Sequence, residues 1–252
     1  MTWFGVALAS FLGTAVEFVE ALTIVLAVLL TKGWRSAFTG AIAAVVTLAA
    51  LVLIFGYPLV HYVQLAIVQF IIGFLMLLFG LRWLRKAILR YSGFKALHNE
   101  GQAFEKELAR QKAQGKSGQG FDSFGAFTSF NGVLLEGLES VFIVITVGLA
   151  ANSLPAAISG SIVALILVVL AGVVFRKPLQ AIPENTLKFV VGVMLSAFGT
   201  FWVGEGLGIG WWNQDLSILV IIAFYLVASL VFVSYLRSVK RANSTASPGV
   251  GM

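Results

Sequence analysis

Apolar residues run through this 252-residue sequence in seven long stretches, separated by shorter polar connections. Each stretch is close to the roughly 20 residues that a helix needs to cross the hydrocarbon core of a bilayer. We expect membrane-spanning helices near residues 4–30, 36–57, 66–84, 125–150, 155–175, 185–206 and 216–236. The pattern predicts an all-α polytopic membrane protein with seven transmembrane helices.

The first three spans resemble the next three. Segment 69–83 aligns with segment 188–202 at an offset of 119 residues, and Gly40 and Pro58 align with Gly160 and Pro178 at an offset of 120. The matched pairs in the aligned segment are Phe70 and Phe189, Gly73 and Gly192, Phe79 and Phe198, Gly80 and Gly199, and Trp83 and Trp202. Because each copy has an odd number of spans, the second must enter the membrane from the opposite side. The sequence therefore predicts an inverted-topology repeat, which many secondary transporters contain.

This repeat divides the chain into five parts. We expect a first three-helix repeat at 1–92, a cytoplasmic linker at 93–124 and a second, inverted three-helix repeat at 125–207. A seventh transmembrane helix at 208–238 and a disordered cytoplasmic tail at 239–252 lie outside the repeat. The linker begins with a pattern typical of a short amphipathic helix and ends in a run rich in Gly, Ser and Gln, which favours flexibility.

Basic residues lie in alternate connections. Lys and Arg follow the first, third, fifth and seventh spans, whereas the connections near 58–65, 151–154 and 207–215 contain neither. Since cytoplasmic loops carry the excess of basic residues, the N-terminus is predicted outside and the C-terminus inside, in a multi-pass protein of the cell (inner) membrane. The net charge of +6 therefore does not indicate nucleic-acid binding.

Composition excludes several classes of protein. With 59% hydrophobic and 11% charged residues, the chain is not a soluble domain. It has no cysteine, so it can form neither a disulfide framework nor a thiolate metal site. The sequence contains no Walker motif, nucleotide-binding glycine fingerprint, Ser-His-Asp arrangement or His-Glu-x-x-His. We therefore expect no enzymatic activity, no catalytic residues and no permanently bound cofactor.

Two copies of one acidic motif interrupt the apolar stretches that open the two repeats. The first reads GTAVEFVEALTIV at 13–25, and the second reads GVLLEGLESVFIV at 132–144. Their glutamates are Glu17, Glu20, Glu136 and Glu139. A charged side chain at the middle of a bilayer costs roughly 2.5–3.5 kcal/mol even on insertion scales. Four carboxylates kept in pairs in such a place suggest a site that holds a cation.

Helix geometry allows these carboxylates to meet. Residues three apart share a helix face, so both acids of one motif can point into the same cavity. Inversion would make the first and fourth spans antiparallel, with their motifs at similar depth. All-oxygen coordination suits Mg²⁺, Ca²⁺, Mn²⁺ and iron. Thr14, Asn131 and Ser140 could add neutral oxygen ligands. Gly13, Gly132 and Gly137 would let the two helices approach each other closely.

Other interpretations of the acids stay open. The four glutamates could be protonated groups that only form hydrogen bonds between helices, although no Lys, Arg or His lies in the middle of a span to neutralise them. Glu205 and Asp215, near the outer end of the sixth span, could attract cations into an outer vestibule or simply be solvated. His61 is expected at the membrane interface rather than on a metal.

The two motifs, one at the start of each half of a seven-span chain, resemble those of the high-affinity iron permeases, the oxidase-dependent iron transporters. The segment LLEGLESVFIV is similar to that family's Arg-Glu-Gly-Leu-Glu signature, but the Arg is Val16 in the first copy and Leu135 in the second. The chain also resembles uncharacterised bacterial membrane proteins with the same paired motifs. The resemblance implies iron as substrate, the four glutamates as its ligands, and a periplasmic oxidase as a partner.

These observations predict a secondary transporter for a metal cation, first of all iron, that binds the ion at mid-membrane between the two Glu-x-x-Glu motifs. An exchanger or exporter of Mn²⁺ or Ca²⁺ against protons is the alternative within transport, although the Glu-x-Gly-Asp motifs of such families are not met. An alternative from another class is a non-transporting membrane assembly or scaffold protein whose glutamates only pack helices.

The alternation of basic connections gives a topology that can be measured. Reporter fusions within residues 93–124 and at the C-terminus should show both segments in the cytoplasm, because both follow spans with basic flanks. A periplasmic signal from either fusion would contradict the inverted repeat.

Overall fold

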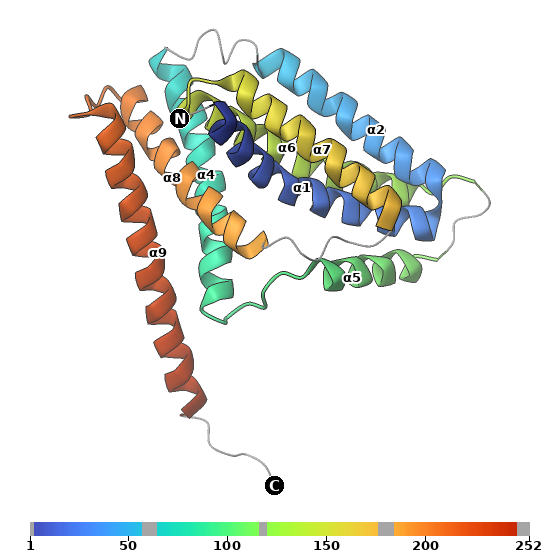
Figure 1. The fold of residues 1–252 in the computed structure, drawn as a ribbon. Helices are drawn as coiled ribbons and strands as arrows, with labels where there is room; N and C mark the ends of the chain where they lie inside the picture. Colours follow the sequence, from blue (N-terminus) through green and yellow to red (C-terminus); the bar gives the residue numbers. More distant parts are fainter. Residues whose placement is uncertain (1–2, 57–64, 116–119, 176–183, 246–252) are drawn as a thin grey trace. The chain divides into compact units, whose positions relative to one another are not determined.

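Helices form the structure of this chain, a computed structural model that describes residues 3–56, 65–115, 120–175 and 184–245. They are α1 (Trp3–Lys32), α2 (Trp34–Leu51), α4 (Ala66–Tyr91), α5 (Glu100–Ala113), α6 (Ser123–Ala150), α7 (Leu154–Phe175), α8 (Glu184–Gly206) and α9 (Gln214–Thr245), with a π-helical segment at Val52–Gly56 (Figure 1). Seven of these helices, all except α5, are long and apolar enough to cross a membrane. The predicted all-α fold with seven spans is confirmed.

The helices group into two compact units, and each unit combines both halves of the sequence. The first unit contains α1, α2, α5, α6 and α7, and the second contains α4, α8 and α9. In the first unit, α1 packs against α6 and α7, and α2 packs against α6. In the second unit, α4 packs against α8. Each unit is therefore stabilised mainly by contacts between the halves.

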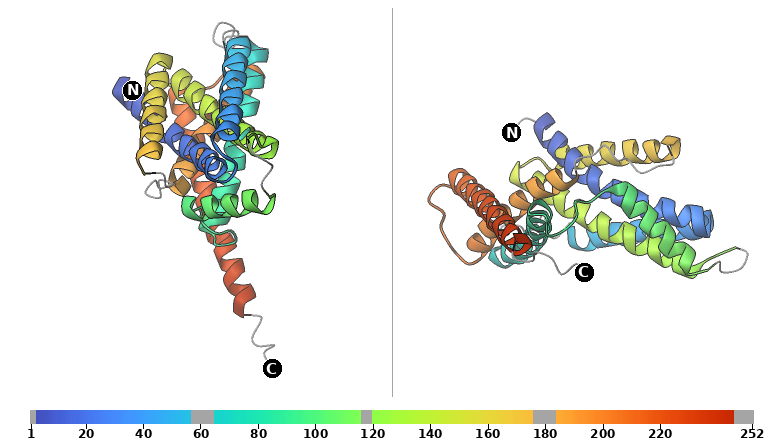
Figure 2. Two further views of the ribbon diagram at one scale, coloured as in Figure 1. Left: turned by 90° about the vertical axis from the view of Figure 1, so that its right-hand side faces the viewer. Right: turned by 90° about the horizontal axis from the view of Figure 1, so that it is seen from below.

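Helix α1 lies at the centre of the first unit. In its most apolar stretch 56% of the residues are buried, against 17% in α2 and 28% in α7. Helix α5 lies alongside α1 (Figure 2). The exposed residues of α2 and α7 are largely apolar, such as Ile42 and Leu170. Exposed apolar faces that run along whole helices suit contact with lipid, as expected for the spans of a membrane protein.

Helices α1 and α6 run antiparallel. Gly125, near the start of α6, lies against Lys32 at the end of α1, and Gly132 lies against Ile24. An added Cβ at either glycine would come within 3 Å of those side chains. The two glycines therefore allow the close approach of the helices that the sequence predicts for Gly132.

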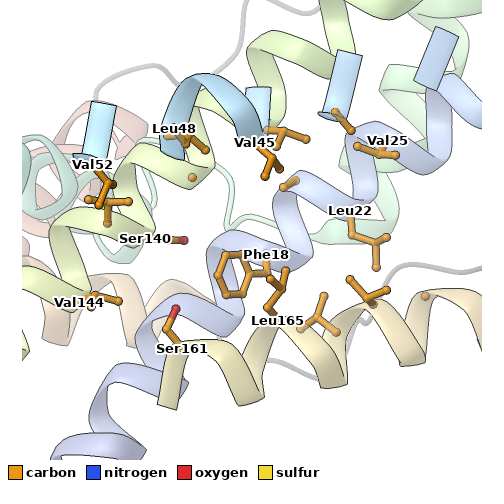
Figure 3. A pocket seen from close by; sticks show the side chains of 18 of the residues that line it. Phe18, Leu22, Val25, Val45, Leu48, Val52, Ser140, Val144, Ser161 and Leu165 are labelled. Carbon is orange, nitrogen blue, oxygen red and sulfur yellow. The ribbon is translucent and has the colours of Figure 1, made fainter. Parts of the chain in front are cut away.

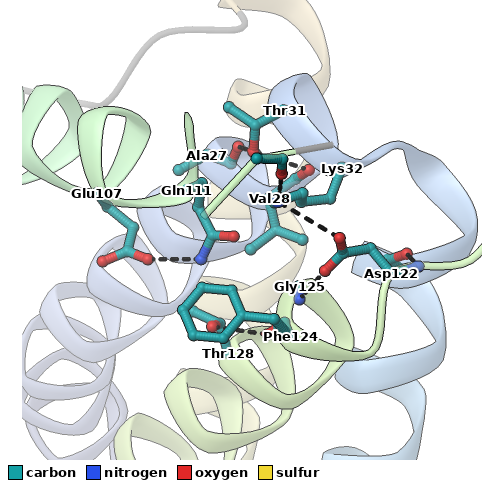
Figure 4. Close-up of polar contacts among 12 residues, drawn as sticks. Ala27, Val28, Thr31, Lys32, Glu107, Gln111, Asp122, Phe124, Gly125 and Thr128 are labelled. Carbon is teal, nitrogen blue, oxygen red and sulfur yellow. Dashed lines mark hydrogen bonds and ion pairs between the residues drawn. The ribbon is translucent and has the colours of Figure 1, made fainter. Parts of the chain in front are cut away.

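Asp122 fixes the start of α6 to two other helices. Its carboxylate accepts a hydrogen bond of 2.7 Å from the backbone N–H of Gly125, which is an N-cap, and pairs with Lys32 Nζ of α1 at 3.3 Å (Figure 4). Its backbone N–H donates to Ser36 Oγ of α2 at 2.7 Å. Since Asp122 and Lys32 are both almost completely buried, these contacts hold α1, α2 and α6 in register.

Glycines at the helix crossings show a reciprocal pattern in the first unit. Gly40 of α2 faces the carbonyl oxygen of Ala126 on α6, and Gly160 of α7 faces the carbonyl oxygen of Ala7 on α1. At both places an added Cβ would overlap that oxygen. Gly40 and Gly160 are 120 residues apart, and Ala7 and Ala126 are 119 apart. The same crossing thus occurs twice, with the two halves exchanged.

The second unit repeats this pattern between α4 and α8. Gly73 of α4 faces the carbonyl oxygen of Gly199 on α8, and Gly192 of α8 faces that of Gly80 on α4. Each of these residues is matched with its counterpart at the offset of 119. Helix α9 packs against α8, where Tyr225 and Thr200 share a hydrogen bond of 2.8 Å.

The structure differs from the predicted spans at two helix ends. The pattern predicts one helix over 36–57, but α2 ends at Leu51 and a π-helical segment follows. A helix is disfavoured next to a proline, and Pro58 comes two residues after that segment. Pro58 itself lies outside the described residues, as do His61 and Pro178.

The other difference is the length of α9. The predicted tail begins at residue 239, whereas α9 continues to Thr245. Arg237 Nε donates a hydrogen bond of 2.9 Å to the carbonyl of Tyr91, and Lys240 Nζ donates to that of Gly93, so the polar end of α9 is anchored at the end of α4. Residues 246–252 lie outside the described part of the chain. The amphipathic helix expected in the linker is confirmed as α5.

The reciprocal glycines can be tested by adding one methyl group. Gly40→Ala and Gly160→Ala should each lower the thermal unfolding temperature in detergent, because overpacking at a close contact costs about 1–3 kcal/mol. Gly210→Ala is the matched control, since its Cβ would have no atom within 4 Å and its φ is not positive. Unfolding of Gly40→Ala and Gly160→Ala at the wild-type temperature would show that the crossings are looser than described.

Candidate metal centre

Helices α1 and α6 carry the two acidic motifs at the same depth. Their register, in which Gly132 lies against Ile24, continues toward the motifs. Four residues further along α6 and four residues back along α1, Glu136 comes to the level of Glu20. The antiparallel packing therefore brings a glutamate from each half of the chain to one place.

Three glutamates meet at this place. One carboxylate oxygen each from Glu17, Glu20 and Glu136 lies within 4.8 Å of the other two. Glu17 has no exposed surface, and Glu20 and Glu136 are partly buried. A hard cation binds oxygens at about 2.0–2.6 Å, so two ligand oxygens on opposite sides of one ion are roughly 4–5 Å apart. The trio has the spacing of a cation site, and the same closeness makes its negative charges repel one another when no proton or cation lies between them.

The structure does not place Glu139, the fourth predicted ligand, in this trio. Glu139 follows Glu136 by one turn of α6 and is 8% exposed. By the helix register it lies at the level of Glu17. The described residues thus bring together three of the four predicted carboxylates, those of Glu17, Glu20 and Glu136. The role of Glu139 stays a prediction.

The three predicted neutral ligands differ in their surroundings. Thr14 is buried one turn before Glu17, and its hydroxyl donates to the carbonyl of Ser10 at 2.8 Å, which leaves the oxygen able to accept or coordinate. Asn131 is partly buried on α6, five residues before Glu136, which is a different helix face. The hydroxyl of Ser140 points into an apolar cavity (Figure 3). Helix position disfavours Asn131 and the apolar cavity disfavours Ser140, so Thr14 has the most suitable surroundings of the three.

That cavity has a volume of about 1160 Å³ and lies between α1, α2, α6 and α7. Its lining is apolar apart from two serines, and includes Phe18, Leu22, Val45 and Leu165 (Figure 3). Such a surface offers a cation two hydroxyl groups, Ser140 and Ser161, and no carboxylate. Because an ion would lose its hydration there without replacement, the cavity does not suit a cation.

Sequence reasoning missed a buried acid in the linker. Glu100, the first residue of α5, is 8% exposed, and its Oε2 accepts a hydrogen bond of 2.8 Å from Thr23 of α1. One of its carboxylate oxygens lies within 4.8 Å of one from Glu20. The signal was present in the helical pattern, because the face of α5 that is turned inward carries Glu100, Phe104, Glu107 and Gln111. Polar residues at three of these four positions indicate polar contacts rather than apolar packing.

The predicted outer acids belong to the second unit. Gln69 Nε2 of α4 donates a hydrogen bond of 3.3 Å to Glu205 of α8, which is partly buried. The side chain of Asp215 and all of His61 lie outside what the structure describes. An outer vestibule therefore stays a prediction.

Comparison with known proteins gives one family. Residues 52–237 match the sequence model of the family described as ferrous iron uptake permease, iron-lead transporter. The match includes the second acidic motif and begins after the first. No curated protein and no solved structure matches the chain.

Proposed function

The chain belongs to the ferrous iron uptake permease family, and on this premise we propose that it is a secondary transporter that carries iron through a carboxylate site between α1 and α6. The observation that carries the proposal is the trio of Glu17, Glu20 and Glu136, whose oxygens lie within 4.8 Å of one another. The family gives the metal and the protein class, and the trio gives a place where the metal can bind.

The chemistry of the trio agrees with an iron substrate. Carboxylate oxygens bind hard and borderline cations, and the chain has no cysteine that would favour softer metals. Glu17 of the trio is fully buried, so its carboxylate needs a counter-charge or a proton. A transported cation supplies that counter-charge. No observation favours Mn²⁺ or Ca²⁺ over the metal of the family.

We infer that the two halves are inverted repeats that alternate access to the site. Reciprocal crossings support this, because the contact of Gly40 with Ala126 recurs as that of Gly160 with Ala7. The antiparallel course of α1 and α6 supports it as well. In secondary transporters of this kind, the substrate site lies near the midplane at the interface of the repeats. The trio supports such a site, because its acids come from α1 in the first half of the chain and from α6 in the second.

The orientation and the partner follow from the same proposal. We infer that Lys32 and Arg35 mark the cytoplasmic end of α1 and α2 in a protein of the inner membrane, so that the linker containing α5 enters α6 from the cytoplasmic side. A periplasmic oxidase would act at the opposite face. Copurification or genetic dependence on such an oxidase would test that part independently of the metal site.

Charge neutralisation in the trio should stop transport without unfolding the protein. Glu17→Gln, Glu20→Gln and Glu136→Gln should each reduce iron(II) uptake into proteoliposomes by about tenfold or more, because a hydrogen bond or contact to a charged group is worth about 1.5–3 kcal/mol. Glu139→Gln is expected to act in the same direction. Glu105→Gln, on the exposed face of α5, is the control. Normal uptake by all of the variants in the trio would overturn the proposed site.

Metal binding should release protons. A carboxylate must be ionised to coordinate a metal, so apparent affinity should rise with pH between about pH 5 and pH 8 as protons are displaced more easily. Titration belongs to the coupled cluster rather than to one residue. Calorimetry in buffers of different ionisation enthalpy counts the protons, and Glu17→Gln and Glu136→Gln should each reduce the count because each removes one ionisable carboxylate from the trio. Binding without proton release over this range would rule out exchange of protons for metal.

A further inference from the structure

Glu100 occupies an unusual place for an acid of a linker helix. Of the other two acids of α5, Glu105 is exposed and Glu107 is partly buried, whereas Glu100 is only 8% exposed. Its carboxylate accepts a hydrogen bond from α1, one of the candidate membrane-spanning helices of the same unit. Burial of a carboxylate is unfavourable unless other groups compensate, so its surroundings need an explanation.

Two contacts fix the position of this carboxylate. Asn99 caps α5, since its side-chain oxygen accepts a hydrogen bond of 3.1 Å from the backbone N–H of Gln102, and the cap sets the first turn of the helix. Thr23 Oγ1 then donates a hydrogen bond of 2.8 Å to Oε2 of Glu100. Thr23 is 3% exposed and lies one turn after Glu20 on α1. Glu100 is therefore held beside the acidic motif rather than in the aqueous loop.

Glu20 is within reach of two sets of carboxylates. One of its oxygens lies within 4.8 Å of an oxygen of Glu17 and of Glu136, and one lies within 4.8 Å of an oxygen of Glu100. The positions on α1 run in order from Glu17 through Glu20 to Thr23, so Glu100 extends the acidic trio toward α5. An ion that moves from the trio past Glu20 to Glu100 exchanges one carboxylate ligand at a time. It therefore keeps at least one carboxylate ligand throughout.

We propose that Glu100 is a further cation-binding residue of the transport pathway, which receives the ion from Glu20 on the side of the membrane where α5 lies. The proposal rests on the proposed function of the trio and extends it by one step. Ions move through proteins when each site binds them strongly enough to admit them and weakly enough to release them. Two neighbouring sites that share a ligand meet both conditions. Glu20 is that shared ligand.

The proposal separates a charge role of Glu100 from a role in docking α5. Glu100→Gln keeps an oxygen that can accept from Thr23 and removes the charge, whereas Thr23→Val removes the hydrogen bond and keeps the charge. If Glu100 binds the cation, Glu100→Gln should be the more damaging change, and Glu100→Asp should restore part of the activity. If Glu100 only docks the helix, Thr23→Val should be at least as damaging.

The experiment measures iron(II) transport in proteoliposomes of known orientation, with the metal presented to one side at a time. We expect Glu100→Gln to raise the KM for iron(II) presented on the side of α5 by about tenfold and to leave the KM from the opposite side within about twofold. Glu105→Gln should change neither. Stabilisation of the detergent-solubilised protein by iron(II), read as a shift in unfolding temperature, should persist in Glu100→Gln because the trio is intact.

The possible failures are distinguishable. Unchanged KM on both sides in Glu100→Gln, or equal loss in Glu100→Gln and Thr23→Val, would overturn the role of Glu100 and leave the trio standing. Full transport by Glu17→Gln and Glu136→Gln would overturn the proposed function itself. Loss of iron(II) stabilisation in Glu100→Gln would also contradict the proposal, because it would place Glu100 in the central site rather than next to it.

Discussion

The repulsion between carboxylates that are buried together is the constraint on which this structure depends. Glu17, Glu20 and Glu136 lie close enough for one ion, in helices whose length and composition suit the interior of a bilayer. Water cannot screen such charges well, so protons or a cation among the oxygens stabilise the arrangement. The fold must therefore hold α1 and α6 close together while leaving the acids able to exchange what neutralises them.

The small residues and the buried ion pair of Asp122 with Lys32 serve this requirement at successive positions along α1 and α6. Gly132 lets α6 approach Ile24 of α1 near the acids, and Asp122 with Lys32 closes the far end of the same helix pair. Breaking a buried ion pair leaves an uncompensated charge, which makes this pair a firm anchor. With one end fixed and the crossing close, the register of the two helices is set, and register decides which glutamates meet.

The sequence allowed much of this to be predicted, and physical reasons explain the rest. Hydrophobic length gave the seven spans, and the two matched acidic motifs gave the expectation that glutamates from both halves meet in one place. Periodicity could not show that Glu139 would stay outside the trio, because side-chain conformation depends on the neighbours in the packed helix pair. Glu100 was missed for a similar reason. The polar residues on one face of α5 indicate polar contacts, but they do not show that α1 is the helix against which α5 packs.

The trio departs from the symmetry of the repeat, since two of its acids come from α1 and one from α6, and its surroundings depart from that symmetry further. The repeat matches Thr23 of α1 with Phe142 of α6, so the hydroxyl that holds Glu100 has an apolar counterpart in the other half. The linker that carries Glu100 connects the halves once and has no second copy. A site with equal ligands from two inverted halves would bind an ion equally well from either face. An acid and a hydroxyl added on one face make the two approaches unequal, which gives a symmetric repeat a physical basis for treating entry and exit of the ion differently.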